Sequence, residues 1–477
     1  MPTAAHALEK RTHLWLRWAV VIAAAALGLL LPRPAAIEPQ GWHMLAIFVA
    51  TVFGLILQPI PMGAMVILAI TVSALTGTVT PRFAFESFGS PIIWLIVAAF
   101  LFARAVVHTR LGRRIAFLFI RGFGSSSLRL GYALAGADLV VSPVIPSDTA
   151  RAGGIIFPIV RSLAEEYGSE PGPTARVLGR YLMQCAYHVG CTTAAIFLTS
   201  MAANPLAVAF AQKYAGVTIT WGEWALAASV PAAVSLALLP ALIYLLDPPE
   251  MKRTPQAQAV ARDELARLGA MTSSEKKLIA ILALVLAGWA TQRWHHVDAA
   301  VIALAGLVAL LLTGIISWEQ VLEEKRAWDA FLWFGGLIMM AEALGRYGVA
   351  QALGTWVSAH LQGWRWLPAL LALVVIYTLA HYAFASMTAH ITALYPAFLV
   401  IALAHGAPPM MAALVLAFFS SLNASLTHYG TGPAPIYFGA GYVPQATWWR
   451  VGSAVVAFQV VVWLGVGLLW WHVLKLW

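Results

Sequence analysis

The chain has 477 residues, of which 61% are hydrophobic and 10% charged, and its formal net charge at pH 7 is +9. Soluble globular proteins carry about 25% charged residues, and no core could bury this much apolar surface. The composition therefore excludes a soluble protein and predicts an all-α polytopic membrane protein with the lipid bilayer as its solvent. Since such proteins concentrate Lys and Arg on cytoplasmic loops, the positive charge does not indicate a nucleic-acid partner.

Apolar stretches long enough to span a bilayer, about 20 residues, recur along the whole chain. They cover residues 14–31, 42–59, 61–78, 90–108, 180–210, 222–246, 276–292, 298–316, 328–348, 407–438 and 448–474. Two further apolar stretches, 128–163 and 365–403, are each interrupted by a Ser-x-Thr sequence. The pattern predicts about 11 transmembrane helices plus two re-entrant hairpins, or 13 spans if both interrupted stretches cross the bilayer.

The first interruption contains Pro146, Ser147, Asp148 and Thr149. Proline disfavours helical geometry in the residue before it, and Ser, Asp and Thr are residues that cap the start of a new helix. We therefore expect one helix to end before Pro146 and another to begin after it. The free N–H groups and the positive dipole end of the new helix would make this break a site for an anion.

Three later breaks follow the same logic. Residues 198–205 contain Asn204 before a proline, residues 385–390 repeat the Ser-x-Thr pattern, and residues 427–435 read THYGTGPAP. Gly and Pro at this density cannot sit in one straight helix, and backbone freed at membrane depth needs partners within the protein or a wet cavity. One hairpin tip and one broken helix from each half would thus meet around a polar pocket.

The two halves of the chain repeat each other. Ser386 follows Ser147, and Trp333 follows Trp94, by the same 239 positions. With the N-terminus cytoplasmic and both interrupted stretches as hairpins, 20 of the 29 Lys and Arg residues lie inside and 7 outside, as the positive-inside rule expects. The expected domains are an N-terminal helix (1–40), a first inverted repeat (41–246, hairpin 128–163), a cytoplasmic solvated linker (247–277) and a second inverted repeat (278–477, hairpin 365–403). Inverted repeats with broken helices are typical of secondary transporters.

The motifs PSDTAR at 146–151, SMTAH at 386–390 and THYGTGPAP at 427–435 resemble the divalent anion:sodium symporter (DASS) family. The likeness covers residues 85–470 and is closest to its citrate/succinate antiporters and 2-oxoglutarate/malate translocators. The resemblance implies transport of di- or tricarboxylates (succinate, malate, 2-oxoglutarate, citrate or tartrate), not enzymatic activity. It also implies a homodimer in the inner membrane, an elevator movement and no cofactor.

The sequence departs from this family twice, with Asp148 and Met387 where the family has Asn. A Met side chain cannot coordinate Na+, which leaves sodium coupling open and favours exchange. An intramembrane Asp costs about 2.5–3.5 kcal/mol on insertion scales. Three interpretations of Asp148 stay open: it pairs with Arg151, it carries a proton with the substrate, or it ligates a cation.

The predicted substrate-binding residues come from all four breaks. They are Ser147, Asp148, Thr149, Asn204, Ser386, Met387, Thr388, Thr431, Gly432 and Pro433. The alternatives to an exchanger are a sodium- or proton-coupled symporter, an anion channel, and a membrane-embedded enzyme using Asp148, His390 or His428. No nucleophile–base pairing or metal-ligand spacing supports the enzyme.

Overall fold

The computed structural model describes residues 4–360 and 363–477, and within these ranges the chain forms helices and no β-strand. The first half comprises α1 (Ala4–Leu30), α2 (Pro39–Leu57), α3 (Met62–Leu75), α4 (Pro81–Glu86), α5 (Pro91–His108), α6 (Leu111–Phe123), α7 (Ser127–Val141), α8 (Asp148–Arg151), α9 (Phe157–Glu166), α10 (Gly179–Ile196), α11 (Asn204–Ala215) and α12 (Trp221–Leu246). Then come α13 (Pro255–Leu268), α14 (Ser273–Ala290), α15 (Gln292–His295), α16 (Ala299–Leu312), α17 (Trp318–Glu323), α18 (Lys325–Arg346), α19 (Val349–His360), α20 (Trp366–Ala380), α21 (Met387–Ala404), α22 (Pro409–Leu422), α23 (Ala434–Gly439) and α24 (Gln445–Val473). The all-α architecture expected from the composition is confirmed.

Short turns of tighter or wider helix mark the breaks. They are η1 (Ser87–Gly89), η2 (Ser142–Val144), η4 (Leu198–Ser200), η5 (His381–Ala383) and η6 (Asn423–Leu426), all 3₁₀, and the π-helix η3 (Ala152–Ile156). Among the described residues, eight helical segments are long and apolar enough to cross a membrane. Shorter apolar helices cover Leu14–Leu30, Met62–Leu75 and Ala299–Leu312. The expected number of spans stays a prediction.

The order of elements in the first half recurs in the second. The series α2, α3, α4, α5, α6, α7, break, α8–α9, α10, break, α11, α12 corresponds to α14, α16, α17, α18, α19, α20, break, α21, α22, break, α23, α24. The packing is reciprocal, because α5 of the first half lies against α16 of the second, and α18 lies against α3. The opposite orientation of the two repeats and their exact boundaries stay predictions.

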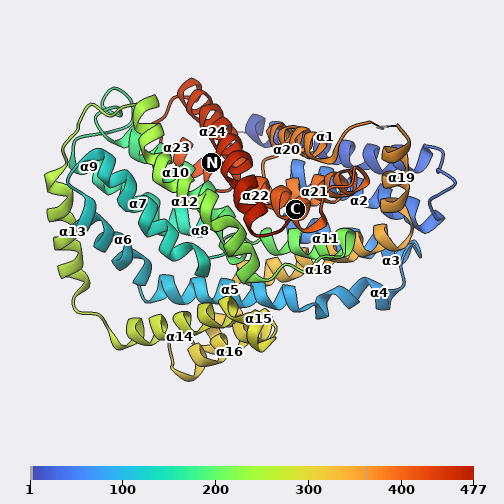
Figure 1. Ribbon diagram of the computed structural model, residues 1–477, viewed down its shortest axis with the longest axis horizontal. Helices are drawn as coiled ribbons and strands as arrows, with labels where there is room; N and C mark the ends of the chain where they lie inside the picture. Colours follow the sequence, from blue (N-terminus) through green and yellow to red (C-terminus); the bar gives the residue numbers. More distant parts are fainter. Residues whose placement is uncertain (1–3, 361–362) are drawn as a thin grey trace.

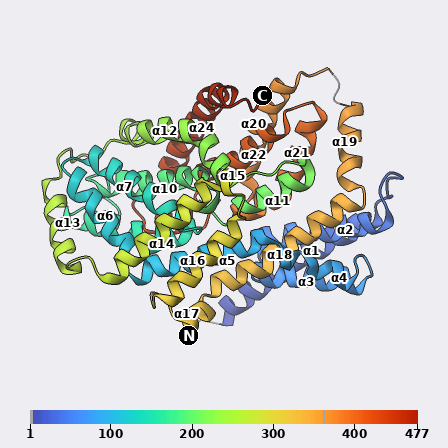
Figure 2. The same cartoon turned by 60° about the horizontal axis from the view of Figure 1, so that its bottom comes forward.

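The molecule is elongated (Figure 1). Helices α6, α7, α9 and α13 gather at one end and α1 to α4 with α19 at the other, while α10, α11 and α22 lie between. The long helices α5 and α18 pack against each other and run side by side along the body (Figure 2). They form a frame that touches both halves.

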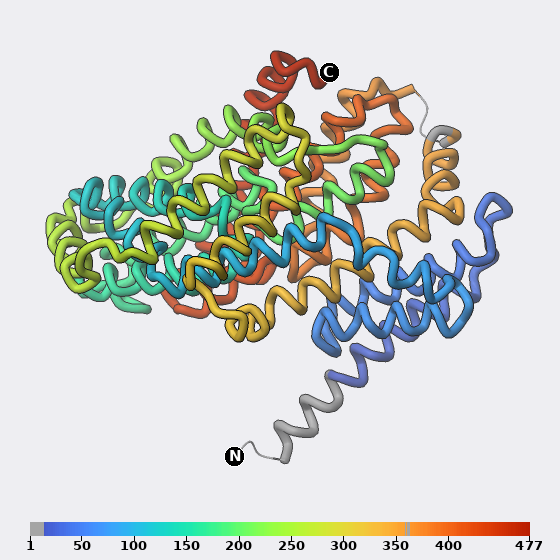
Figure 3. Tube along the Cα trace, turned by 90° about the horizontal axis from the view of Figure 1, so that it is seen from below, coloured from blue at the N-terminus to red at the C-terminus, as the bar shows by residue number. Residues whose placement is uncertain are grey.

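The linker between the halves differs from the solvated segment expected for 247–277. It contains α13, which lies at the opposite end of the molecule from α19 (Figure 3) and packs on α6 through the buried Ala257 and Ala261, one helical turn apart. Asp247 is also buried and pairs with Arg180. The apolar face of α13 is short and lies among many charged residues, and hydrogen bonds such as that from the Thr254 hydroxyl to the carbonyl of Gly124 also hold the linker to the body.

Candidate functional site

The first hairpin tip has the local structure that its sequence predicts. Ile145, before Pro146, is extended with φ −122° and ψ 94°. Ser147 is also extended, and its side-chain oxygen accepts a hydrogen bond of 3.1 Å from the backbone N–H of Ala150, which starts α8. Helix α8 continues through the π-helix η3 into α9. The predicted helix–break–helix is confirmed, with Ser147 as the N-cap.

The second hairpin tip repeats this arrangement. Ser386 is extended with φ −154° and ψ 132°, and its hydroxyl accepts from the N–H of Ala389 at 3.4 Å to start the 18-residue helix α21. The turn η5 ends the preceding helix α20, as η2 ends α7 in the first hairpin. Two serines 239 positions apart therefore cap equivalent helices.

Both tips line a single cavity of about 240 Å³. Its walls are formed by Gln58, Phe100, Pro146, Ser147, Asp148, Thr149, Met201, Ala202, Ala203, Ala385, Ser386, Met387, Thr388 and Gly432. The cavity thus brings together both Ser-x-Thr motifs, the break at 198–205 and, through Gly432, part of the break at 427–435. Asp148 is the charged residue among these lining residues, which include no Lys, Arg or His.

Two predicted site residues do not line this cavity but lie at the breaks behind it. Asn204 is buried, and its amide nitrogen donates to the carbonyls of Ala194 at 2.8 Å and Phe197 at 3.1 Å. Thr431 is buried and accepts from the N–H of Ala434 at 3.2 Å, at the start of α23. Asn204 and Thr431 thus stabilise backbone at the two breaks.

Pro433 lines a separate narrow space of about 10 Å³. Asp138, Asp148 and Arg151 also line it, so it lies directly behind the first tip. Asp148 therefore stands between this space and the main cavity.

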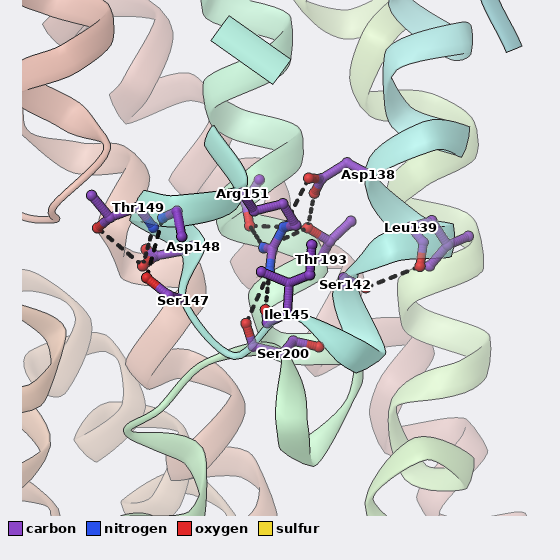
Figure 4. Close-up of polar contacts among 12 residues, drawn as sticks. Asp138, Leu139, Ser142, Ile145, Ser147, Asp148, Thr149, Arg151, Thr193 and Ser200 are labelled. Atoms are coloured by element: carbon purple, nitrogen blue, oxygen red, sulfur yellow. Dashed lines mark hydrogen bonds and ion pairs between the residues drawn. The ribbon is translucent and has the colours of Figure 1, made fainter. Parts of the chain in front are cut away.

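Arg151 does not pair with Asp148. Its Nε lies 2.8 Å from Oδ1 of Asp138 on α7, and both side chains are buried. Asp148 instead accepts a hydrogen bond of 2.8 Å from the backbone N–H of Thr149. Figure 4 shows the two side chains directed apart, that of Arg151 toward Asp138 and that of Asp148 beside Ser147 and Thr149. The interpretation of Asp148 as the partner of Arg151 is therefore wrong.

Gln58 and Phe100 were not predicted as site residues. Phe100 belongs to the frame helix α5, and Gln58 ends α2 in the left-handed conformation, with φ 48°. A single amide between an apolar helix and Pro59 was the available signal for Gln58. Phe100 lies in an unbroken apolar helix and offers no signal in its sequence.

A larger cavity of about 570 Å³ lies elsewhere, between α5, α11, α12, α16 and α18. Its lining includes Lys213 and Glu342 but none of the predicted site residues. We take the smaller cavity as the site because both hairpin tips converge on it.

Comparisons with known proteins agree with this architecture. Residues 12–477 match the model of the sodium:sulfate symporter transmembrane region. The chain is 45% identical over 456 residues to the putative malate transporter YflS of Bacillus subtilis, covering 95% of each chain. It is 43% identical to the chloroplastic dicarboxylate transporter 1 of Spinacia oleracea, over 94% of this chain and 79% of that one. A solved structure, the YdaH transporter of Alcanivorax borkumensis, matches with a TM-score of 0.53 over 97% of both chains at 13% identity, which shows a shared fold.

Proposed function

The chain belongs to the divalent anion:sodium symporter (DASS) family, and from this premise we propose that it exchanges one di- or tricarboxylate anion for another across the cytoplasmic membrane. It is a multi-pass membrane transporter and not an enzyme. The Bacillus and Spinacia relatives are described as a putative malate transporter and a dicarboxylate transporter, which supports dicarboxylates as substrates.

One observation carries the proposal: the capped helix starts at Ser147 and Ser386 face the same cavity. A helix N-terminus presents the positive end of the helix dipole, which suits a carboxylate, and this dipole remains where Ser147 and Ser386 cap the first N–H groups. Two such ends from opposite hairpins suit an anion with a carboxylate at each end. The hydroxyls of Thr149 and Thr388, which line the same cavity, would add donors.

The walls of the cavity also support an elevator movement. Gln58 and Phe100 come from α2 and α5, whereas the remaining walls come from the hairpins and broken helices. We propose that the hairpins with α10, α11 and α22 move as one body along the frame of α5 and α18. In the same proposal the protein is a homodimer with its N-terminus in the cytoplasm.

Asp148 determines the coupling mode in this proposal. A dicarboxylate would enter a cavity whose lining holds one carboxyl group and no basic side chain. With Arg151 committed to Asp138, either a proton on Asp148 or a cation beside it must offset the added charge. The runner-up function, symport with Na+ or H+, rests on the same residue.

The test is counterflow in vesicles that contain the purified protein. Vesicles loaded with succinate should take up labelled malate, 2-oxoglutarate or citrate faster than empty vesicles, with and without sodium. Equal uptake by loaded and empty vesicles would contradict exchange and favour a channel or a symporter. For Asp148→Asn we expect a changed pH or sodium dependence, and identical profiles would exclude Asp148 from coupling.

A further inference from the structure

The Arg151 side chain joins four parts of the first repeat. Its guanidinium is buried, with 1% of the residue exposed. It donates to Oδ1 of Asp138 at 2.8 Å, to the carbonyls of Ile145 at 3.1 Å, Ser200 at 3.0 Å and Gly190 at 3.4 Å, and to Oγ1 of Thr193 at 3.3 Å. Figure 4 shows these contacts running from the tip to α7, α10 and the turn η4. One planar cation thereby ties the hairpin tip to the broken helix behind it.

The second repeat has a histidine at the equivalent position. His390 follows Ser386 by four residues, as Arg151 follows Ser147, and both lie 239 positions apart. The Nε2 of His390 lies 3.1 Å from the carbonyl oxygen of Tyr377, which is itself 239 positions after Asp138. Its Nδ1 lies 3.3 Å from the amide nitrogen of Asn423 on η6, the break that follows α22. In both halves the side chain thus joins the helix before the tip (α7 or α20), the tip itself, and the turn at the following break (η4 or η6).

We infer that Arg151, held by Asp138, is a positioning residue that fixes the first hairpin tip to the α10–η4 break, and that His390 does the same in the second half. The inference rests on the proposed function, because it concerns the cavity proposed to hold the carboxylate. Arg151 donates a hydrogen bond across the tip to the carbonyl of Ile145, the residue directly before Pro146. Because it also holds Ser200, next to the lining residue Met201, it sets the spacing between the tip and the facing wall.

The replacement Arg151→Lys tests the fork geometry without removing the charge. An ammonium group has three donors at one point and cannot reach acceptors spread around a guanidinium. We expect the KM for carboxylate exchange to rise by at least about tenfold, with Vmax within about threefold of wild type. The matched control is Arg129→Lys on α7, an exposed arginine that contacts Ser125 and should leave KM unchanged. A wild-type KM for Arg151→Lys would overturn the inference.

A second readout does not need transport. In Thr149→Cys, labelling by a water-soluble maleimide reports how the tip is held, since both native cysteines are buried. We expect Arg151→Lys to speed this labelling by at least about tenfold. Equal labelling rates with and without Arg151→Lys would overturn the positioning role.

The two readouts separate the failure of each idea. If wild-type vesicles exchange no carboxylate, the proposed function fails, while the labelling comparison still decides whether Arg151 positions the tip. Should Arg151→Lys not fold, the paired variant Asp138→Leu/Arg151→Met removes both charges together and leaves no unpaired buried ion. The same labelling increase is then expected, and its absence would count against the inference.

Discussion

Replacing Gly432 by alanine should weaken transport, because the added methyl group would enter space that the first hairpin tip occupies. A Cβ at this position would lie 2.1 Å from Oγ1 and 3.3 Å from Cβ of Thr149. The first distance is far shorter than any van der Waals contact. Gly432 is not among the described glycines with a positive φ, so its backbone accepts alanine and the constraint is steric. The contact joins the broken helix of one half to the hairpin of the other.

The size of the effect follows from how the contact can relax. Thr149 can turn its hydroxyl away from the methyl group, or the whole tip can shift. Either response disturbs a group that lines the cavity. Overpacking of this kind costs about 1–3 kcal/mol, and about 1.4 kcal/mol corresponds to a factor of ten. If the cost falls on the substrate-bound state, KM should rise by about 5-fold to 150-fold.

Counterflow of labelled malate into succinate-loaded vesicles would measure KM and Vmax for Gly432→Ala. The matched control is Gly439→Ala in α23, where an added Cβ meets nothing within 4 Å. In the double variant with Thr149→Ala the obstructing hydroxyl is gone, so the Gly432→Ala penalty should shrink. A wild-type KM for Gly432→Ala, or an equal loss for Gly439→Ala, would refute the reasoning.

Three further outcomes follow from other contacts. Gln58→Ala removes the amide that the end of α2 contributes to the cavity, and KM should rise about 2- to 10-fold. An unchanged KM in the same assay would show that Gln58 does not contact the substrate. Burial raises the pKa of the Glu275 carboxyl, but hydrogen bonds from Arg114 and Thr272 outweigh it and hold the pKa below its ordinary value. Glu275 lies just before the apolar part of α14, and its stabilising effect is therefore present above about pH 4.3 and lost as pH falls through the lowered pKa. The difference in melting temperature between wild type and Glu275→Gln should become smaller on acidification. A difference that stays constant with pH would contradict this. His390→Ala should lower the free energy of unfolding by about 1–3 kcal/mol. Asp138→Asn should lower it more, by about 3–5 kcal/mol, because it leaves the buried Arg151 cation unpaired. Denaturant unfolding in detergent compares the two variants, and a larger loss for His390→Ala would contradict this.

The sequence predicted what depends on neighbouring residues. Ser147 and Ser386 cap helices because each is itself extended and its hydroxyl accepts from the N–H three residues further on. The 239-position offset placed both tips in equivalent parts of two similar halves. The structure then shows that both tips line one cavity.

Which residues the side chains of Arg151 and Asn204 would bind could not be predicted in the same way. Within one helix, Asp148 lies three residues from Arg151 and is its nearest acid in the sequence. Arg151 pairs with Asp138 because the packing of α7, α10 and the turn η4 places Asp138, Thr193 and three carbonyls around the guanidinium, and this depends on the fold. Likewise, Asn204 looks like a ligand-binding amide in the sequence, but it is used by backbone carbonyls at its own break.

The pairing of Arg151 with Asp138 has a consequence for coupling. It leaves the Asp148 carboxyl at the cavity without a basic partner among the described residues. In an exchanger, the site crosses the membrane loaded in both directions. Whatever charge Asp148 carries therefore crosses equally each way, and the swap of one dicarboxylate for another moves no net charge. In a symporter the site must return empty, and an ionised Asp148 would then move net charge across the membrane unless a proton or a cation returned with it. The charge balance therefore supports the exchange proposed above, and so does Met387, which offers no oxygen ligand at the matching position of the second tip.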